Sequence, residues 1–170
     1  MSTIQTIRIE REWAMPNHRT FQMPPVKKLI QEENPGGIIA EPFPFESNID
    51  CFEYLSQFKD ESVDFVLLDP PYTKRQVSEH YAKNGIKASS WQTSSGWTAK
   101  IKRECARILK VGGKSITFGY NTNGLGKVNG MKITRILICP SGGDHYDLLC
   151  TVETKVQGRL IPITELMSCD

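Results

Sequence analysis

A mostly apolar run from Val63 to Leu68 is the clearest feature of the hydrophobic pattern. It is too short for a core helix and lacks the alternation of a half-exposed strand, so it predicts a strand buried on both faces of a parallel sheet. Asp69 follows, and Pro70 and Pro71 end the strand because proline cannot donate to a ladder of hydrogen bonds. In open α/β sheets, ligands bind beyond this carboxyl end of the strands.

The rest of the pattern alternates between short helices and strands. Helices are expected after Pro24-Pro25, after Asp50 as N-cap and from Trp97, and strands at residues 38–40, 114–120, 132–139 and 146–156. The last two strands predict a terminal hairpin. We therefore expect one α/β domain spanning residues 1–170, with an N-terminal arm at 1–23 that holds a short strand followed by a loop. The polar segment 73–96 has little periodicity and is interpreted as a substrate loop.

Composition narrows the class of protein. A chain of 170 residues with 39% hydrophobic residues is an ordinary globular domain. Its five cysteines are odd in number and form no Cys-x-x-Cys pair, so we expect neither a disulfide framework nor a metal site, and interpret them as reduced thiols of a cytoplasmic protein. No apolar run approaches about 18 residues, so no membrane span is expected.

Charge is unevenly distributed although the net charge is only +2. Residues 31–69 hold ten acids and one lysine, whereas residues 73–114 hold ten bases and two acids. An anionic polymer would be drawn to the second region, which begins at Lys74 and Arg75 beside the proline pair. This favours contact with nucleic acid, although a solvated helix face with the same charge would produce the same bias.

The tetrapeptide Asp69-Pro70-Pro71-Tyr72 carries the candidate chemistry. Asp69 and the Pro70 carbonyl can accept hydrogen bonds from an amino group, and Tyr72 offers an aromatic face to a planar base. Two acceptors aimed at an exocyclic amine would bias it toward a geometry in which its lone pair can attack a methyl group. A rigid turn after a core strand is the simpler explanation of the same residues.

This tetrapeptide resembles the catalytic signature of amino-methyltransferases that use S-adenosylmethionine, above all those that methylate N6 of adenine in DNA. Trp13 to Asn17, Thr20-Phe21, Gly119 and Asn121-x-Asn123-Gly124 resemble a group of small adenine-specific DNA methyltransferases carried by phages and mobile elements. The resemblance covers about residues 7 to 156. It implies a truncated Rossmann-like methyltransferase sheet, with Asp69, Pro70, Pro71 and Tyr72 as catalytic residues and no metal.

The resemblance also implies cofactor contacts. Phe21 would lie beside S-adenosylmethionine, Asp50 near its adenine, and Glu41-Pro42-Phe43 near its methionine part, with Asp69 closing the site. The match is poor around Glu41, which replaces an aspartate; the small residues that allow close backbone approach are absent, and a second strand is missing. Asp50 as a plain N-cap, and Trp13 and Phe21 as plain core residues, remain alternatives.

DNA is the expected partner, bound through Lys74, Arg75, Lys83, Lys87 and Trp91. Trp91 would stack on a base or anchor its loop, whereas Trp97 is expected to anchor the next helix in the core. Similar tetrapeptides occur in enzymes that methylate N2 of guanine in RNA, and a nucleic-acid-binding relic without a cofactor pocket is a third hypothesis. So small an enzyme is expected to act with a second copy of itself or to tolerate low sequence specificity.

Overall fold

A mixed sheet forms the centre of the computed structural model, which describes residues 6–17, 19–44, 49–71, 74–83, 85, 92, 94–143 and 146–158, without the side chains of residues 74, 75, 80 and 83. The described strands form one six-stranded sheet in the order β1-β5-β6-β4-β3-β2. Their bounds are β1 (Arg8–Arg11), β2 (Ile39–Ala40), β3 (Val63–Leu68), β4 (Leu109–Gly119), β5 (Met131–Cys139) and β6 (Leu148–Lys155). Only β6 runs antiparallel to its neighbours. The other five strands therefore end at the same edge, which we call the carboxyl edge.

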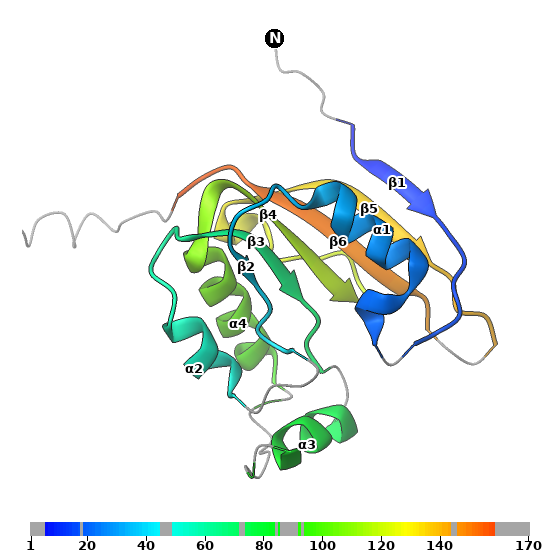
Figure 1. Ribbon diagram of the computed structural model, residues 1–170, viewed down its shortest axis with the longest axis horizontal. Helices are drawn as coiled ribbons and strands as arrows, with labels where there is room; N and C mark the ends of the chain where they lie inside the picture. The colour runs from blue at the N-terminus through cyan, green and yellow to red at the C-terminus, as the bar shows by residue number, and fades with distance from the viewer. Residues whose placement is uncertain are drawn as a thin grey trace, which may run out of the picture.

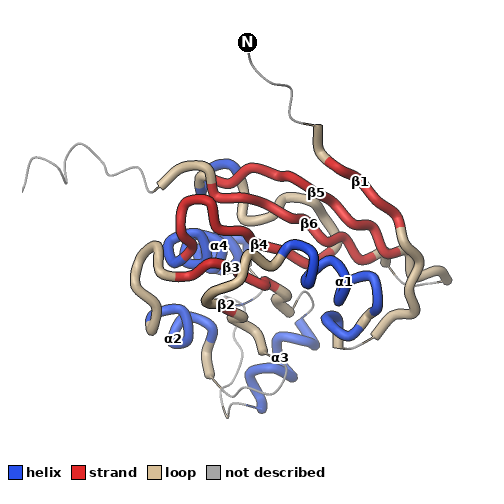
Figure 2. Tube along the Cα trace, turned by 45° about the horizontal axis from the view of Figure 1, so that its top comes forward, coloured by secondary structure: helices blue, strands red, loops and turns tan. Residues whose placement is uncertain are grey.

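Helices cover the two faces of this sheet (Figures 1 and 2). Helix α1 (Pro24–Glu33) packs on one face, where its Val26 and Leu29 meet Phe65 and Phe118. Helices α2 (Cys51–Ser56) and α4 (Ser95–Ile108) pack on the other, and α3 (Lys74–Lys83) lies beyond the carboxyl end of β3 (Figure 1). Two short 3-10 turns complete the fold, η1 (Thr20–Gln22) and η3 (Lys127–Asn129).

Most of the elements expected from the hydrophobic pattern are confirmed. The buried strand ends at Leu68, the proline pair opens α1, Asp50 caps α2, and β5 and β6 form the antiparallel terminal hairpin. Trp97 is buried, as expected of a core anchor. The mixed α/β architecture is compatible with a methyltransferase-like fold.

One expectation about a connecting segment was wrong in part. Residues 73–96 are not one continuous loop, because α3 occupies Lys74–Lys83 and buries Val77 and Tyr81 as a helical face should. The short strand expected in the N-terminal arm is confirmed. Its residues Arg8–Arg11 form β1, which pairs with β5 in parallel and is an outermost strand of the sheet.

Buried ions hold this edge strand in place. Arg135 on β5 is almost fully buried and donates hydrogen bonds to Glu10 of β1 and to Glu32 and Glu33 of α1. Hydrogen bonds from Arg135 lower the pKa of Glu10, and those from Lys114 and Arg135 outweigh burial in lowering that of Glu33. We call Arg135, Glu10, Glu32 and Glu33 the Arg135 cluster.

The described residues contain no helix long and apolar enough to cross a membrane. They also contain no group of three His, Cys, Asp or Glu side chains arranged to hold a metal ion. Cys51, Cys105, Cys139 and Cys150 are buried free thiols.

Candidate active site

Asp69 stands at the carboxyl edge, directly after β3, which lies between β4 and β2 in the sheet. Its carboxylate is partly buried, and burial raises its pKa to about 6. A hydrogen bond from the Thr20 hydroxyl opposes this shift by stabilising the charged form. In the described part of the chain, no basic side chain contributes to offsetting this charge. Asp69 is thus an anion at neutral pH, but the fold holds its pKa close to that pH.

Glu41 supplies a second carboxylate near Asp69. It follows β2, which is the neighbour of β3 in the sheet. Burial raises its pKa, and repulsion from the Asp69 charge raises it further. Its backbone N–H donates to the Tyr54 hydroxyl at 3.1 Å, which ties the end of β2 to α2. Two carboxylates without a described cation between them favour a positively charged ligand.

Thr20 and Phe21 come to Asp69 from the N-terminal arm. Both lie in η1, and the Phe21 ring packs against Phe118 of β4 with ring centroids 4.9 Å apart. This contact fixes η1 on the sheet, and Thr20 is thereby held in reach of the Asp69 carboxylate. The sequence pointed to Phe21 but not to the role of Thr20, because a lone threonine in a polar segment carries no signal of its own.

Pro70, Pro42 and Phe43 are buried beside this site. The Phe43 ring meets the Trp97 ring edge to face, with centroids 5.9 Å apart, so its area is used for core packing. Pro71 is only partly buried. The segment after β2 is therefore packed against α4, while the Asp69 carboxylate is bound by Thr20 of η1.

Asp50 joins two helices near the site. Its Oδ1 accepts hydrogen bonds from the backbone N–H groups of Phe52 at 2.8 Å and Glu53 at 3.3 Å, which confirms the N-cap. Its Oδ2 accepts from the buried Tyr81 hydroxyl at 3.0 Å, which connects α3 to α2. The cap and the cofactor contact are compatible, but the structure gives evidence only for the cap. Tyr81 was missed because the sequence hides the helical periodicity of α3 among polar residues.

The expected nucleic-acid contacts fall on or beyond α3. Lys74, Arg75 and Lys83 belong to this helix, but their side chains are outside the described part of the structure. Tyr72, Lys87 and Trp91 lie outside the described residues altogether. The structure thus places α3 after the proline pair and leaves the five nucleic-acid contacts and the catalytic role of Tyr72 as predictions.

The charge bias of the sequence is partly cancelled by folding. Three bases of the segment 73–114 bind acids of the segment 31–69: Arg107 binds Asp60, Lys110 binds Asp64 and Lys114 binds Glu33, at 2.7, 2.7 and 2.8 Å. These bases stabilise the fold and are poor candidates for phosphate contacts. The remaining argument for a basic surface rests on the bases near α3.

Two backbone amides of the loop 121–126 are taken up by the fold. The backbone N–H groups of Leu125 and Gly126 donate to the buried Glu153 carboxylate at 2.5 and 3.0 Å. Gly124 has φ +56, and a Cβ there would lie 2.3 Å from a Glu153 carboxylate oxygen. Glycine is required at this position because the loop closes tightly over a buried acid.

Comparison with known proteins gives one partial similarity. No protein-family model matches the chain. A stretch of 74 residues, 44% of the chain, is 35% identical to the Type II methyltransferase M.BamHI of Bacillus amyloliquefaciens. This stretch corresponds to only 16% of that protein, so the chain spans a small part of its length. The similarity supports a relationship to methyltransferases at a coarse level.

Proposed function

We propose that this protein transfers a methyl group from S-adenosylmethionine to the exocyclic N6 amine of adenine in DNA. The observation that carries the proposal is Asp69. It is an anion whose charge no described base offsets, it sits at the carboxyl end of a buried parallel strand, and Pro70-Pro71-Tyr72 follow it. The partial similarity to a methyltransferase supports the same reaction class.

In this proposal the chain positions the amine. The Asp69 carboxylate and the Pro70 carbonyl accept the two N6 hydrogens, and Tyr72 stacks on the base after it leaves the duplex. The amine is then oriented so that its lone pair forms the new N–C bond as the C–S bond breaks and its electrons remain on sulfur. The nitrogen afterwards releases one proton. Positioning and electrostatic stabilisation do most of this work.

The residues around Asp69 fit the cofactor in charge. S-adenosylmethionine would supply an electrophilic methyl on a positively charged sulfur. Asp69 and Glu41 provide two carboxylates with raised pKa values, and a neighbouring positive charge would stabilise both in their ionised forms. Phe21 in η1 and Asp50 at the N-cap of α2 would complete the contacts.

Cofactor binding is the first test. Calorimetric titration with S-adenosylmethionine should detect micromolar binding, roughly 8 kcal/mol. Transfer of a labelled methyl group to DNA should then be reduced by about 100-fold or more in Asp69→Ala, because the amine loses its charged acceptor. DNA affinity of this variant should be largely unchanged. An Asp69→Ala protein with full activity would overturn the catalytic assignment.

Two alternatives are separated by the same measurements. Preferential methylation of structured RNA at N2 of guanine would identify an RNA enzyme with the same amine-positioning turn. No detectable cofactor binding with intact nucleic-acid binding would identify a relic. The shortened region of the sequence around Glu41 is the feature that supports the relic.

A further inference from the structure

Large apolar side chains are exposed where the N-terminal arm passes the carboxyl edge. Trp13 is 63% exposed and Met15 69%, although burying such groups normally stabilises a fold. Trp13 is thus not a core residue, which settles the alternative raised by the sequence. Exposed aromatic groups of this size commonly mark binding surfaces.

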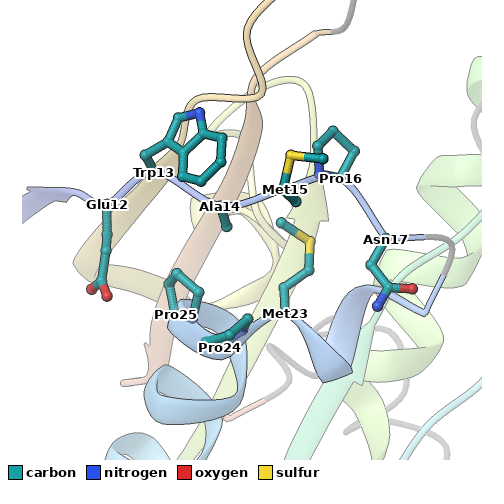
Figure 3. A pocket seen from close by; sticks show the side chains of 9 residues that line it. All are labelled: Glu12, Trp13, Ala14, Met15, Pro16, Asn17, Met23, Pro24 and Pro25. Carbon is teal, nitrogen blue, oxygen red and sulfur yellow. The ribbon is translucent and has the colours of Figure 1, made fainter.

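A pocket of about 380 Å³ lies between this arm and the start of α1 (Figure 3). Its volume is at the lower end of the range for small-molecule pockets, roughly 300–1,000 Å³. Most of its lining is apolar, and the Met23 side chain extends from the start of α1 toward Met15 (Figure 3). Glu12 and Asn17 add a carboxylate and an amide, the groups that can bind the edge of a base.

A pair of exposed tyrosines lies at the same carboxyl edge. Tyr120 follows β4 and Tyr146 precedes β6, their rings are 5.3 Å apart, and they are 47% and 78% exposed. The strand order places them between the arm that follows β1 and Asp69 after β3. Four strand spacings separate β1 from β3, about 20 Å. This is the length of a few nucleotides.

We propose that Trp13, its pocket and the Tyr120–Tyr146 pair bind unpaired nucleotides that flank the target base. The proposal rests on the proposed function, in which one base leaves the duplex at Asp69. Its neighbours then lose a stacking partner, and aromatic side chains replace it. Arg11 and Arg19 precede and follow the pocket segment of the arm and can meet phosphates.

A nucleic acid fits this surface better than a second copy of the chain. The aromatic side chains are spread along an edge that leads to Asp69, and polar Glu12, Asn17 and Asp147 interrupt them. A stable protein interface would need about 800 Å² of surface from each partner with a continuous apolar centre. Stacking on separate rings has no such requirement.

The test compares a fluorescent single-stranded oligonucleotide with the duplex of the same sequence, in a binding assay at constant salt. Trp13→Ala and Tyr146→Ala should each weaken single-strand binding by roughly 5- to 100-fold. Trp13→Phe and Tyr146→Phe keep a ring and should retain most of the affinity. Val128→Ala is the matched control, because Val128 is 96% exposed in η3, before β5 and therefore at the opposite edge. It should change nothing.

Three results would overturn the proposal. The first is unchanged single-strand affinity in both alanine variants, and the second is a loss of S-adenosylmethionine affinity in Trp13→Ala without loss of nucleic-acid binding. The third is a change in molecular mass, measured by light scattering, that accounts for the weaker binding. Methyl transfer to DNA with Trp13-independent binding would refute this inference alone. Trp13-dependent binding of single strands without any methyl transfer would refute the proposed function alone.

Discussion

The carboxyl groups of Asp69 and of the Arg135 cluster have pKa values shifted in opposite directions. Glu10 and Glu33 share a buried arginine, and their pKa values are lowered. Asp69 has a hydrogen bond from Thr20 but no described cation, and its pKa is raised to about 6. Burial alone raises the pKa of every carboxyl group. The difference is that a nearby cation stabilises the charges of Glu10 and Glu33 but not that of Asp69.

This contrast separates stability from function. A compensated cluster holds β1 and α1 on β5 and gains from being charged. An uncompensated acid costs stability in the free protein, and such a cost is typical of sites that await a ligand. If Asp69 is the functional acid, removing its charge should stabilise the protein, whereas disturbing the Arg135 cluster should destabilise it.

Arg135→Met should have the largest effect on stability. It removes the cation and leaves three carboxylates together, which should lower the free energy of unfolding by about 2 to 4 kcal/mol at pH 7. The deficit should shrink near pH 4, where the carboxylates take up protons. Urea denaturation at both pH values measures it.

Arg8→Ala is the control for this variant. It breaks an exposed ion pair with Glu10, which should be worth at most about 0.5 kcal/mol. A similar loss in both variants would contradict the importance of the buried arginine.

Asp69→Asn should instead raise stability, by about 1 to 3 kcal/mol at pH 7. The folded pKa, about 6, lies above the ordinary value of 3.8, so the folded state holds the proton more tightly than the unfolded state. Ionisation of Asp69 therefore lowers the free energy of unfolding progressively as pH rises from about 4 to about 6. Above pH 6 the size of this loss stays constant. The advantage of the variant should be absent at pH 4 and complete above pH 6.

The control is Asp64→Asn. Hydrogen bonds from Lys110 and the Ile38 backbone lower the pKa of Asp64, so removing its charge should not stabilise the protein. An equal gain from both substitutions would mean that the effect comes from net charge and not from the burial of Asp69.

Thr20→Val should have the smallest effect, on pH dependence. Losing the hydrogen bond to the carboxylate should raise the pKa of Asp69 further, by roughly half to one unit. If methyl transfer requires ionised Asp69, the acid limb of the pH–rate profile, expected near pH 6, should move up by the same amount. In Asp69→Asn, whose amide oxygen does not titrate, this limb should vanish from any residual activity. An unmoved limb in Thr20→Val would exclude Asp69 as its origin.

The hydrophobic pattern was sufficient for most of the fold. The apolar run before Asp69, the proline pair before α1 and the alternation in β5 and β6 are local signals, because each element forms from residues close in sequence. Helix α3 was missed because Val77 and Tyr81 supply its buried face from within a polar segment. A weak helical period cannot be recognised until the surface that it covers is known.

For the candidate site, the sequence alone determined the tetrapeptide Asp69-Pro70-Pro71-Tyr72 and its place after a buried strand. Only the tertiary structure decided which charges meet. Folding brings bases of residues 73–114 onto acids of residues 31–69, and Thr20 and Glu41 to Asp69. The reason is physical: strand propensity acts over a few residues, whereas electrostatic compensation depends on distances and burial that exist only after the chain has packed.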